Sequence, residues 1–115
     1  MILNKKEEIE AWLNQYKIKK YELIEDEKYG YIVNVKNNVD LYGLCLKEIN
    51  VKFNEVYGDF DCGVNYLKNY DFLPCFVKNY LNLSFNLFKE FPEEAIKVGK
   101  GNKQKLKNLF IPINM

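Results

Sequence analysis

The hydrophobic positions of this chain repeat every 21 residues through its middle. Segments that begin at Val35, Val56 and Val77 place their apolar residues in matching columns. In each segment two apolar residues alternate with polar ones, and this period of two predicts a short strand with one buried face. A fixed period of about 20 to 29 residues is typical of leucine-rich-repeat coils, so we expect residues 35–92 to form three coils of a small solenoid. Its buried strand face should consist of Val39, Leu41, Phe60, Cys62, Leu81 and Leu83.

An asparagine follows the strand in two of the three segments. Asn65 and Asn86 occupy the same column, whereas the first segment has Leu44 there. A buried turn needs partners for its backbone N–H and C=O groups, and an asparagine amide both donates and accepts. We therefore expect these two side chains to form a structural ladder between neighbouring coils.

One stretch carries a resemblance to a known group of proteins. The stretch Val56-Tyr-Gly-Asp-Phe-Asp-Cys-Gly-Val-Asn-Tyr-Leu67, followed by Phe72-Leu73-Pro74 and then by residues 77–88, resembles the leucine-rich-repeat-like proteins of bacteriophages and prophages. The group has a recurring coil of the form Val-x-Gly-x-Phe-x-Cys-x-x-Asn-x-Leu after a segment that ends in proline. The resemblance covers roughly residues 30–92 and implies a protein-binding role.

The front of the chain predicts a cap for the repeats. Asn4 and Glu7 have the spacing of a capping box, and apolar residues follow at helical spacing, so residues 4–16 should form a helix. This helix should pack Trp12 and Leu13 over the first coil. Residues 19–34 are extended, with strands expected at Tyr21–Ile24 and Tyr29–Val35 around the polar turn of a hairpin. Together these elements predict a single α+β domain over residues 1–115.

The end of the chain is basic. Residues 95–115 carry a net charge of +5, whereas the preceding 94 residues carry −4. Residues 93–115 are expected to be a C-terminal cap or tail, and Leu106, Leu109 and Phe110 recur at the spacing of a short capping helix. The alternative is a basic patch that binds an acidic partner or nucleic acid. That patch would consist of Lys97, Lys100, Lys103, Lys105 and Lys107.

The chain lacks the residues that several kinds of catalysis and metal binding require. The chain has no histidine, which removes histidine-based nucleophile pairs, histidine zinc ligands and the commonest general base. Asp59 and Asp61 have no further ligands at the spacing of a metal loop. Cys45, Cys62 and Cys75 are odd in number and form no C-x-x-C motif, so neither a disulfide framework nor a zinc ribbon is expected. We expect no catalytic residues, no metal and no cofactor.

Cellular placement follows from the absence of certain segments. No apolar run after Met1 has the form of a signal peptide or a membrane span. We therefore expect a cytoplasmic protein with no membrane partner. The oligomeric state stays open.

The predicted binding surface is the solvent-facing side of the strands. The 21-residue register predicts three rows of side chains that combine carboxylates with tyrosines, a composition suited to a basic protein surface. The alternative is that this polar face is merely solvated. The rows are Asn38, Asp59 and Tyr80, then Asp40, Asp61 and Asn82, then Tyr42, Gly63 and Ser84.

The leading functional hypothesis is a non-enzymatic protein-binding module that uses this face. The alternative is a phage or mobile-element inhibitor of a bacterial defence nuclease, similar to an anti-CRISPR protein, which binds a ribonucleoprotein or its guide RNA. A direct nucleic-acid binder would depend on the tail lysines and on salt. An enzyme of unknown type would depend on Asp59 or Asp61.

Overall fold

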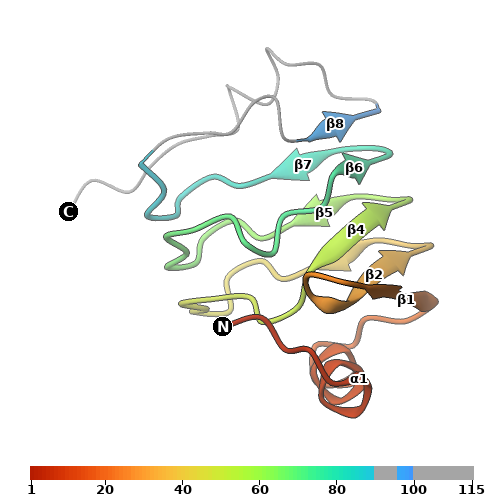
Figure 1. The fold of residues 1–115 in the computed structure, drawn as a ribbon. Coiled ribbons are helices and arrows are strands. Elements are labelled where there is room, and N and C mark those ends of the chain that lie inside the picture. Colours follow the sequence, from red (N-terminus) through yellow and green to blue (C-terminus); the bar gives the residue numbers. More distant parts are fainter. Residues whose placement is uncertain (90–95, 100–115) are drawn as a thin grey trace.

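Residues 1–89 and 96–99, which the computed structural model describes, form one helix and eight strands. The strands build two sheets (Figure 1). The larger is a mixed five-stranded sheet in the order β1-β2-β4-β6-β8, and the smaller is a parallel sheet in the order β3-β5-β7. The elements are α1 (Lys6–Gln15), β1 (Tyr21–Asp26), β2 (Gly30–Val35), β3 (Val39–Asp40), β4 (Phe53–Val56), β5 (Phe60–Asp61), β6 (Phe76–Val77), β7 (Leu81–Asn82) and β8 (Lys97–Val98).

The 21-residue spacing appears in the register of the parallel strands. In the larger sheet Val56 pairs with Val35 on one side and with Val77 on the other. In the smaller sheet Phe60 lies between Val39 and Leu81 in the same way. The alignment of the hydrophobic columns is therefore confirmed.

The prediction of a leucine-rich-repeat-like solenoid is wrong. The structure is a small α+β globule of 36 × 30 × 25 Å with two sheets, and the hairpin belongs to the larger sheet instead of leading into separate coils. A hydrophobic period fixes which residues align between parallel strands, but it does not fix how many strands one period holds. The prediction placed one strand in each period, whereas residues 53–61 and 76–82 each contribute two strands, one to each sheet.

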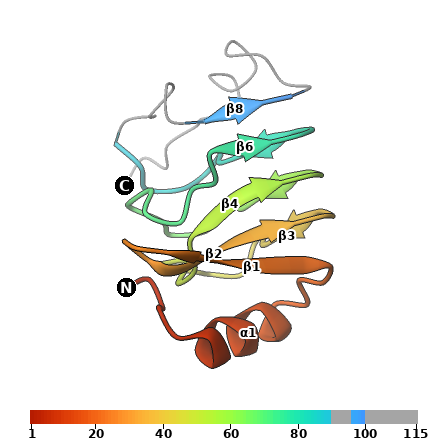
Figure 2. The ribbon, with the colours of Figure 1, turned by 45° about the vertical axis from the view of Figure 1, so that its right-hand side comes forward.

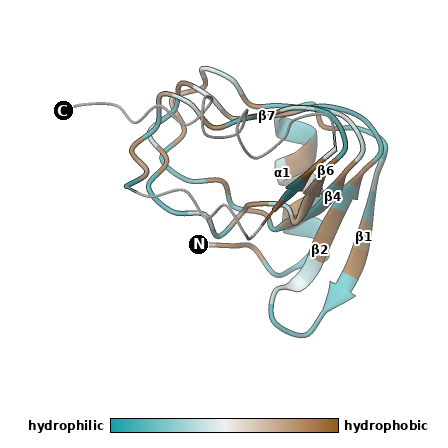
Figure 3. Ribbon diagram, turned by 90° about the horizontal axis from the view of Figure 1, so that it is seen from above, coloured by the Kyte–Doolittle hydropathy of each residue, from teal (hydrophilic) through white to brown (hydrophobic). Residues whose placement is uncertain are grey.

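The core lies between the two sheets. All six residues of the predicted buried strand face are buried, and Phe53 of the larger sheet meets Phe60 of the smaller one edge to face, with ring centroids 5.2 Å apart. Phe72 also stacks on Phe60, with ring centroids 6.1 Å apart. Seen from above, β1, β2, β4 and β6 of the larger sheet lie on one side of the molecule (Figure 3). The burial of Cys62 is confirmed as well.

The hairpin predicted before the first repeat is confirmed. Strands β1 and β2 pair antiparallel from Tyr21 opposite Val35 to Asp26 opposite Gly30. Asp26 Oδ2 accepts hydrogen bonds from the backbone N–H groups of Lys28 and Tyr29, which shapes the turn. Gly30 has φ +77°, and a Cβ there would lie 2.6 Å from the carbonyl oxygen of Asn4, so glycine is required at this position.

Helix α1 lies at one end of the stack, beside the hairpin (Figure 2). Ile9, Trp12 and Leu13 are buried, as expected for a cap, and the Trp12 ring contacts Phe53 at 6.3 Å. The predicted capping box is wrong, because the N-cap residue is Lys5 and no side chain bonds to the first turn. Asn4 precedes the cap position by one residue, so its side chain does not take that role.

The asparagine ladder is confirmed. The buried Asn65 accepts hydrogen bonds from the N–H groups of Leu44 and Leu46 and donates to the carbonyl oxygen of Leu41 at 2.8 Å. Asn86 repeats this arrangement 21 residues further along, in the next layer, where a layer is one 21-residue segment of the stack. It accepts from the Leu67 N–H and donates to the Cys62 carbonyl oxygen. Each amide therefore joins two successive layers of backbone.

The C-terminal predictions fall mostly outside the described residues. Lys97 is described and exposed, in β8 at the edge of the larger sheet. Lys100, Lys103, Lys105 and Lys107 lie outside the described ranges, as does the capping helix expected around Leu106.

Candidate partner-binding face

The outward side of the small parallel sheet carries the predicted second row. Asp40 of β3 pairs with Asp61 of β5, which pairs with Asn82 of β7. Their inward neighbours Val39, Phe60 and Leu81 are buried, so the alternation of the strands turns these polar residues outward. Asp40 is exposed, whereas Asp61 and Asn82 are half-buried.

Each residue of this row also shapes its own chain. The Oδ1 atom of Asp40 accepts a hydrogen bond from the N–H two residues on, at Tyr42, and Asp61 does the same with Gly63 at 3.0 Å. Asn82 accepts from the Ser84 N–H. Such turns explain why aspartate or asparagine occupies this column in every layer. Between layers, the Asn82 amide donates to Asp61 Oδ1 at 3.1 Å.

The first predicted row forms a second ladder between layers. Asn38 Oδ1 accepts a hydrogen bond from the Asp59 N–H at 2.7 Å, and Asp59 Oδ1 accepts from the Tyr80 N–H at 3.1 Å. The side chains of Asn38 and Asp59 therefore connect neighbouring segments, and they are also accessible to solvent. Asp59 is brought close to Asp40 and Asp61 by this ladder.

Four of the predicted residues surround one hollow of about 210 Å³. Its lining consists of Asn38, Val39, Asp40, Asp59 and Asp61. In the described part of the chain the single ion pair joins the N-terminal amine to Glu48, so no cation neutralises these three carboxylates. Among the described residues, each of the three aspartates accepts its hydrogen bonds through Oδ1.

The protonation of Asp61 reflects this arrangement. Partial burial raises the pKa of its carboxyl group above the ordinary value, and repulsion from Asp40 and Asp59 raises it further. The hydrogen bonds from Gly63 and Asn82 act in the opposite direction. No described positive group forms an ion pair with Asp61, and a positive group in the hollow would favour its ionised form.

The third predicted row is only partly a surface. Tyr42 is 54% exposed, but Ser84 is 8% exposed and Gly63 is buried. A larger residue at position 63 would displace the Asn82 side chain, since a Cβ there would lie 2.7 Å from Asn82 Nδ2. Tyr80 is 43% exposed. Tyr42 lies two residues after Asp40 and Tyr80 lies two residues before Asn82, but neither tyrosine lines the hollow.

The sequence analysis missed Gly58 as a residue of this face. A Cβ at Gly58 would lie 2.4 Å from Asn38 Oδ1, the atom that binds the Asp59 N–H. Only glycine leaves room for that bond. The signal was present, since position 58 lies in one 21-residue column with Asn37 and Asn79, and both glycine and asparagine are typical of tight turns.

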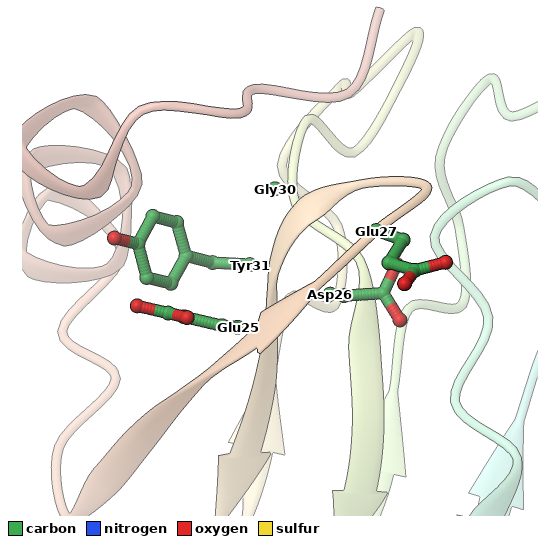
Figure 4. Close-up of a pocket in the computed structure, with 5 residues that line it drawn as sticks. All are labelled: Glu25, Asp26, Glu27, Gly30 and Tyr31. Atoms are coloured by element: carbon green, nitrogen blue, oxygen red, sulfur yellow. The ribbon is translucent and has the colours of Figure 1, made fainter.

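A second group of acidic residues lies at the hairpin tip. A hollow there is lined by Glu25, Asp26, Glu27, Gly30 and Tyr31. In Figure 4 the Glu25 side chain lies beside the Tyr31 ring on the side of α1, while Asp26 and Glu27 point the other way. The hairpin carboxylates therefore diverge, unlike those of the small sheet.

Comparisons of the chain with protein-family models, with curated proteins and with solved structures find no match. The resemblance to phage leucine-rich-repeat-like proteins therefore stays a prediction. Among the described residues, no helix is long and apolar enough to cross a membrane. Nor does that part of the chain bring together three acidic or cysteine side chains in a group that could hold a metal ion.

Proposed function

We propose that the chain is a non-enzymatic protein-binding module whose β3-β5-β7 face receives a basic side chain of its partner. The observation that carries the proposal is the hollow with three carboxylates and no compensating cation among the described residues. An arginine guanidinium suits this hollow, because its planar array of N–H donors matches carboxylate oxygens. The exposed Tyr42 supplies contact area with a polar tip beside it.

The proposal is tested by affinity capture from a lysate of the source cells. An Asp40→Asn, Asp61→Asn double variant keeps the oxygen that binds Tyr42 or Gly63 but removes two charges. The matched control is Glu22→Gln, Glu27→Gln, which removes two exposed charges from the hairpin. We expect the same partner to be captured by the parent and the control, and at least tenfold less by the aspartate variant.

The captured partner is then purified and its binding measured by calorimetry at two salt concentrations. Equal affinity for the parent and the aspartate variant would contradict the proposal and leave the face as a solvated surface. The carboxylate row would also suit a protein that imitates nucleic-acid phosphates, so inhibition of a defence nuclease stays an alternative. The identity of the captured partner decides between the two.

A further inference from the structure

A column of three lysines stands on another side of the molecule. Lys47, Lys68 and Lys89 are 21 residues apart and all exposed. The Tyr66 N–H donates to the Leu46 carbonyl oxygen at 2.7 Å, and the Leu87 N–H donates to that of Leu67 at 2.9 Å. Leu46 and Leu67 directly precede Lys47 and Lys68, so these two hydrogen bonds hold Lys47 and Lys68 in consecutive layers. In Figure 1 the segments that follow β3, β5 and β7 lie one above another.

Two adjoining hollows lie along this column. The first, of about 300 Å³, is lined by Lys47, Tyr66, Lys68 and Leu87. The second, of about 450 Å³, is lined by Lys68, Tyr70, Leu87 and Lys89. Each hollow therefore combines two lysines with one tyrosine and shares Lys68 with its neighbour. No described acidic residue lines either of them.

The three lysines and the Tyr66 ring of this edge are exposed. None of the three lysines forms an ion pair with any residue in 1–89 or 96–99. The Tyr66 side chain is 44% exposed. The Tyr70 ring is held in place by stacking on Phe88, with centroids 4.2 Å apart and planes 17° from parallel.

We propose that this lysine edge, consisting of Lys47, Lys68, Lys89, Tyr66 and Tyr70, binds a single-stranded nucleic acid. Neighbouring layers are about 4.8 Å apart, so three lysines span about 10 Å, the length of about three stacked nucleotides. A hollow that recurs in each layer fits a ligand that repeats a negative charge and a flat ring. An acidic peptide repeats the charge without the ring, whereas base stacking on aromatic side chains is typical of single-strand binding.

The test is the fluorescence anisotropy of a labelled twelve-residue oligothymidylate at several salt concentrations. Three phosphate contacts predict a slope of about −2 in log affinity against log salt, and Lys68→Gln should reduce its magnitude by about 0.7. Tyr66→Ala should weaken binding about 5- to 150-fold, whereas Tyr66→Phe should retain it because the ring is kept. These side chains are exposed, and equal urea midpoints of the variants establish that the fold is unchanged.

Two comparisons separate this edge from other basic surfaces. Lys19→Gln removes an exposed charge after α1, and Lys103→Gln, Lys105→Gln, Lys107→Gln removes three charges of the tail. The proposal is overturned if binding is absent at 50 mM salt, or if it follows the tail or Lys19 variants and not Lys68. It is also overturned if polyglutamate of equal length competes as well as unlabelled oligothymidylate. The proposed protein-binding face consists of different residues, so the result of this experiment and the result of the capture experiment are independent of each other.

Discussion

Aspartate and asparagine side chains of the proposed binding face also shape the backbone that carries them. Asp40, Asp61 and Asn82 each bind the backbone N–H two residues on, which fixes the direction of their side chains. The sequence pattern predicted this row and its outward direction. It did not reveal that Gly63 and Ser84 are buried, because both residue types are common on surfaces and in cores.

The charge of Asp61 predicts a stability change. A raised pKa means that the folded state holds the Asp61 proton more tightly than the unfolded state does, so ionisation costs stability as pH rises through the folded-state value. Asp61→Asn keeps the acceptor for Gly63 and should be more stable than the parent at pH 7, by less than about 1 kcal/mol because water screens a half-exposed carboxylate.

Urea unfolding of both proteins between pH 3 and pH 7 measures this effect. The advantage of Asp61→Asn should shrink towards acid pH, where the parent carboxyl group is protonated. Glu22→Gln on the exposed side of β1 serves as the control and should show no comparable advantage. A less stable Asp61→Asn protein at pH 7 would mean that the carboxylate is favourable in the folded state.

The asparagine ladder predicts a larger effect. Asn86→Ala would leave the buried N–H of Leu67 without its partner, whereas the carbonyl oxygen of Cys62 would keep its hydrogen bond from Asn65. At about 1–3 kcal/mol for an unsatisfied buried group, the free energy of unfolding should fall by about 1–3 kcal/mol. Asn69 also accepts a backbone bond, from Asp71, but in an exposed turn. Urea unfolding should therefore show a loss below about 1 kcal/mol for Asn69→Ala, and equal losses would refute the ladder.

At the element scale, the hairpin was predictable and the two sheets were not. Alternating residues on either side of a polar turn define β1 and β2 locally. The period of two predicted strands at β3, β5 and β7, but β6 has only two residues, too few for a period to be recognised, and its partner in β4 lies 21 residues away. The number of strands in one repeat is therefore set by contacts between layers that a single segment does not encode.

Helix α1 begins without a capping hydrogen bond from a side chain, and a substitution at its N-cap can test this. Lys5 has the extended conformation of an N-cap residue, with φ −101° and ψ 134°, but its side chain has no oxygen to bind the first-turn N–H groups. Lys5→Asp should raise the free energy of unfolding by about 1 kcal/mol. Lys5→Ala removes the same positive charge without supplying a cap, so an equal gain in urea unfolding would show that charge alone is responsible.

At the scale of the whole molecule, the stack of layers turns single residues into columns. Carboxylates gather on the small sheet, and lysines gather on the segments that follow its strands. The sequence predicted the acidic column from its strands but missed the basic one, because Lys47, Lys68 and Lys89 lie outside any strand. A chain with a net charge of only +1 can therefore present separate acidic and basic surfaces.

Binding of a basic side chain in the carboxylate hollow can be measured by NMR of the ¹⁵N-labelled protein. The probe is a short blocked peptide with one arginine among glycines. The amides of Tyr42 and Gly63, which bind Asp40 and Asp61, should shift saturably in the parent and not in the Asp40→Asn, Asp61→Asn variant. The amides of Lys28 and Tyr29, bound to Asp26 in the hairpin, are an internal control. Equal shifts in both pairs of amides, or none at Tyr42 and Gly63, would contradict the account.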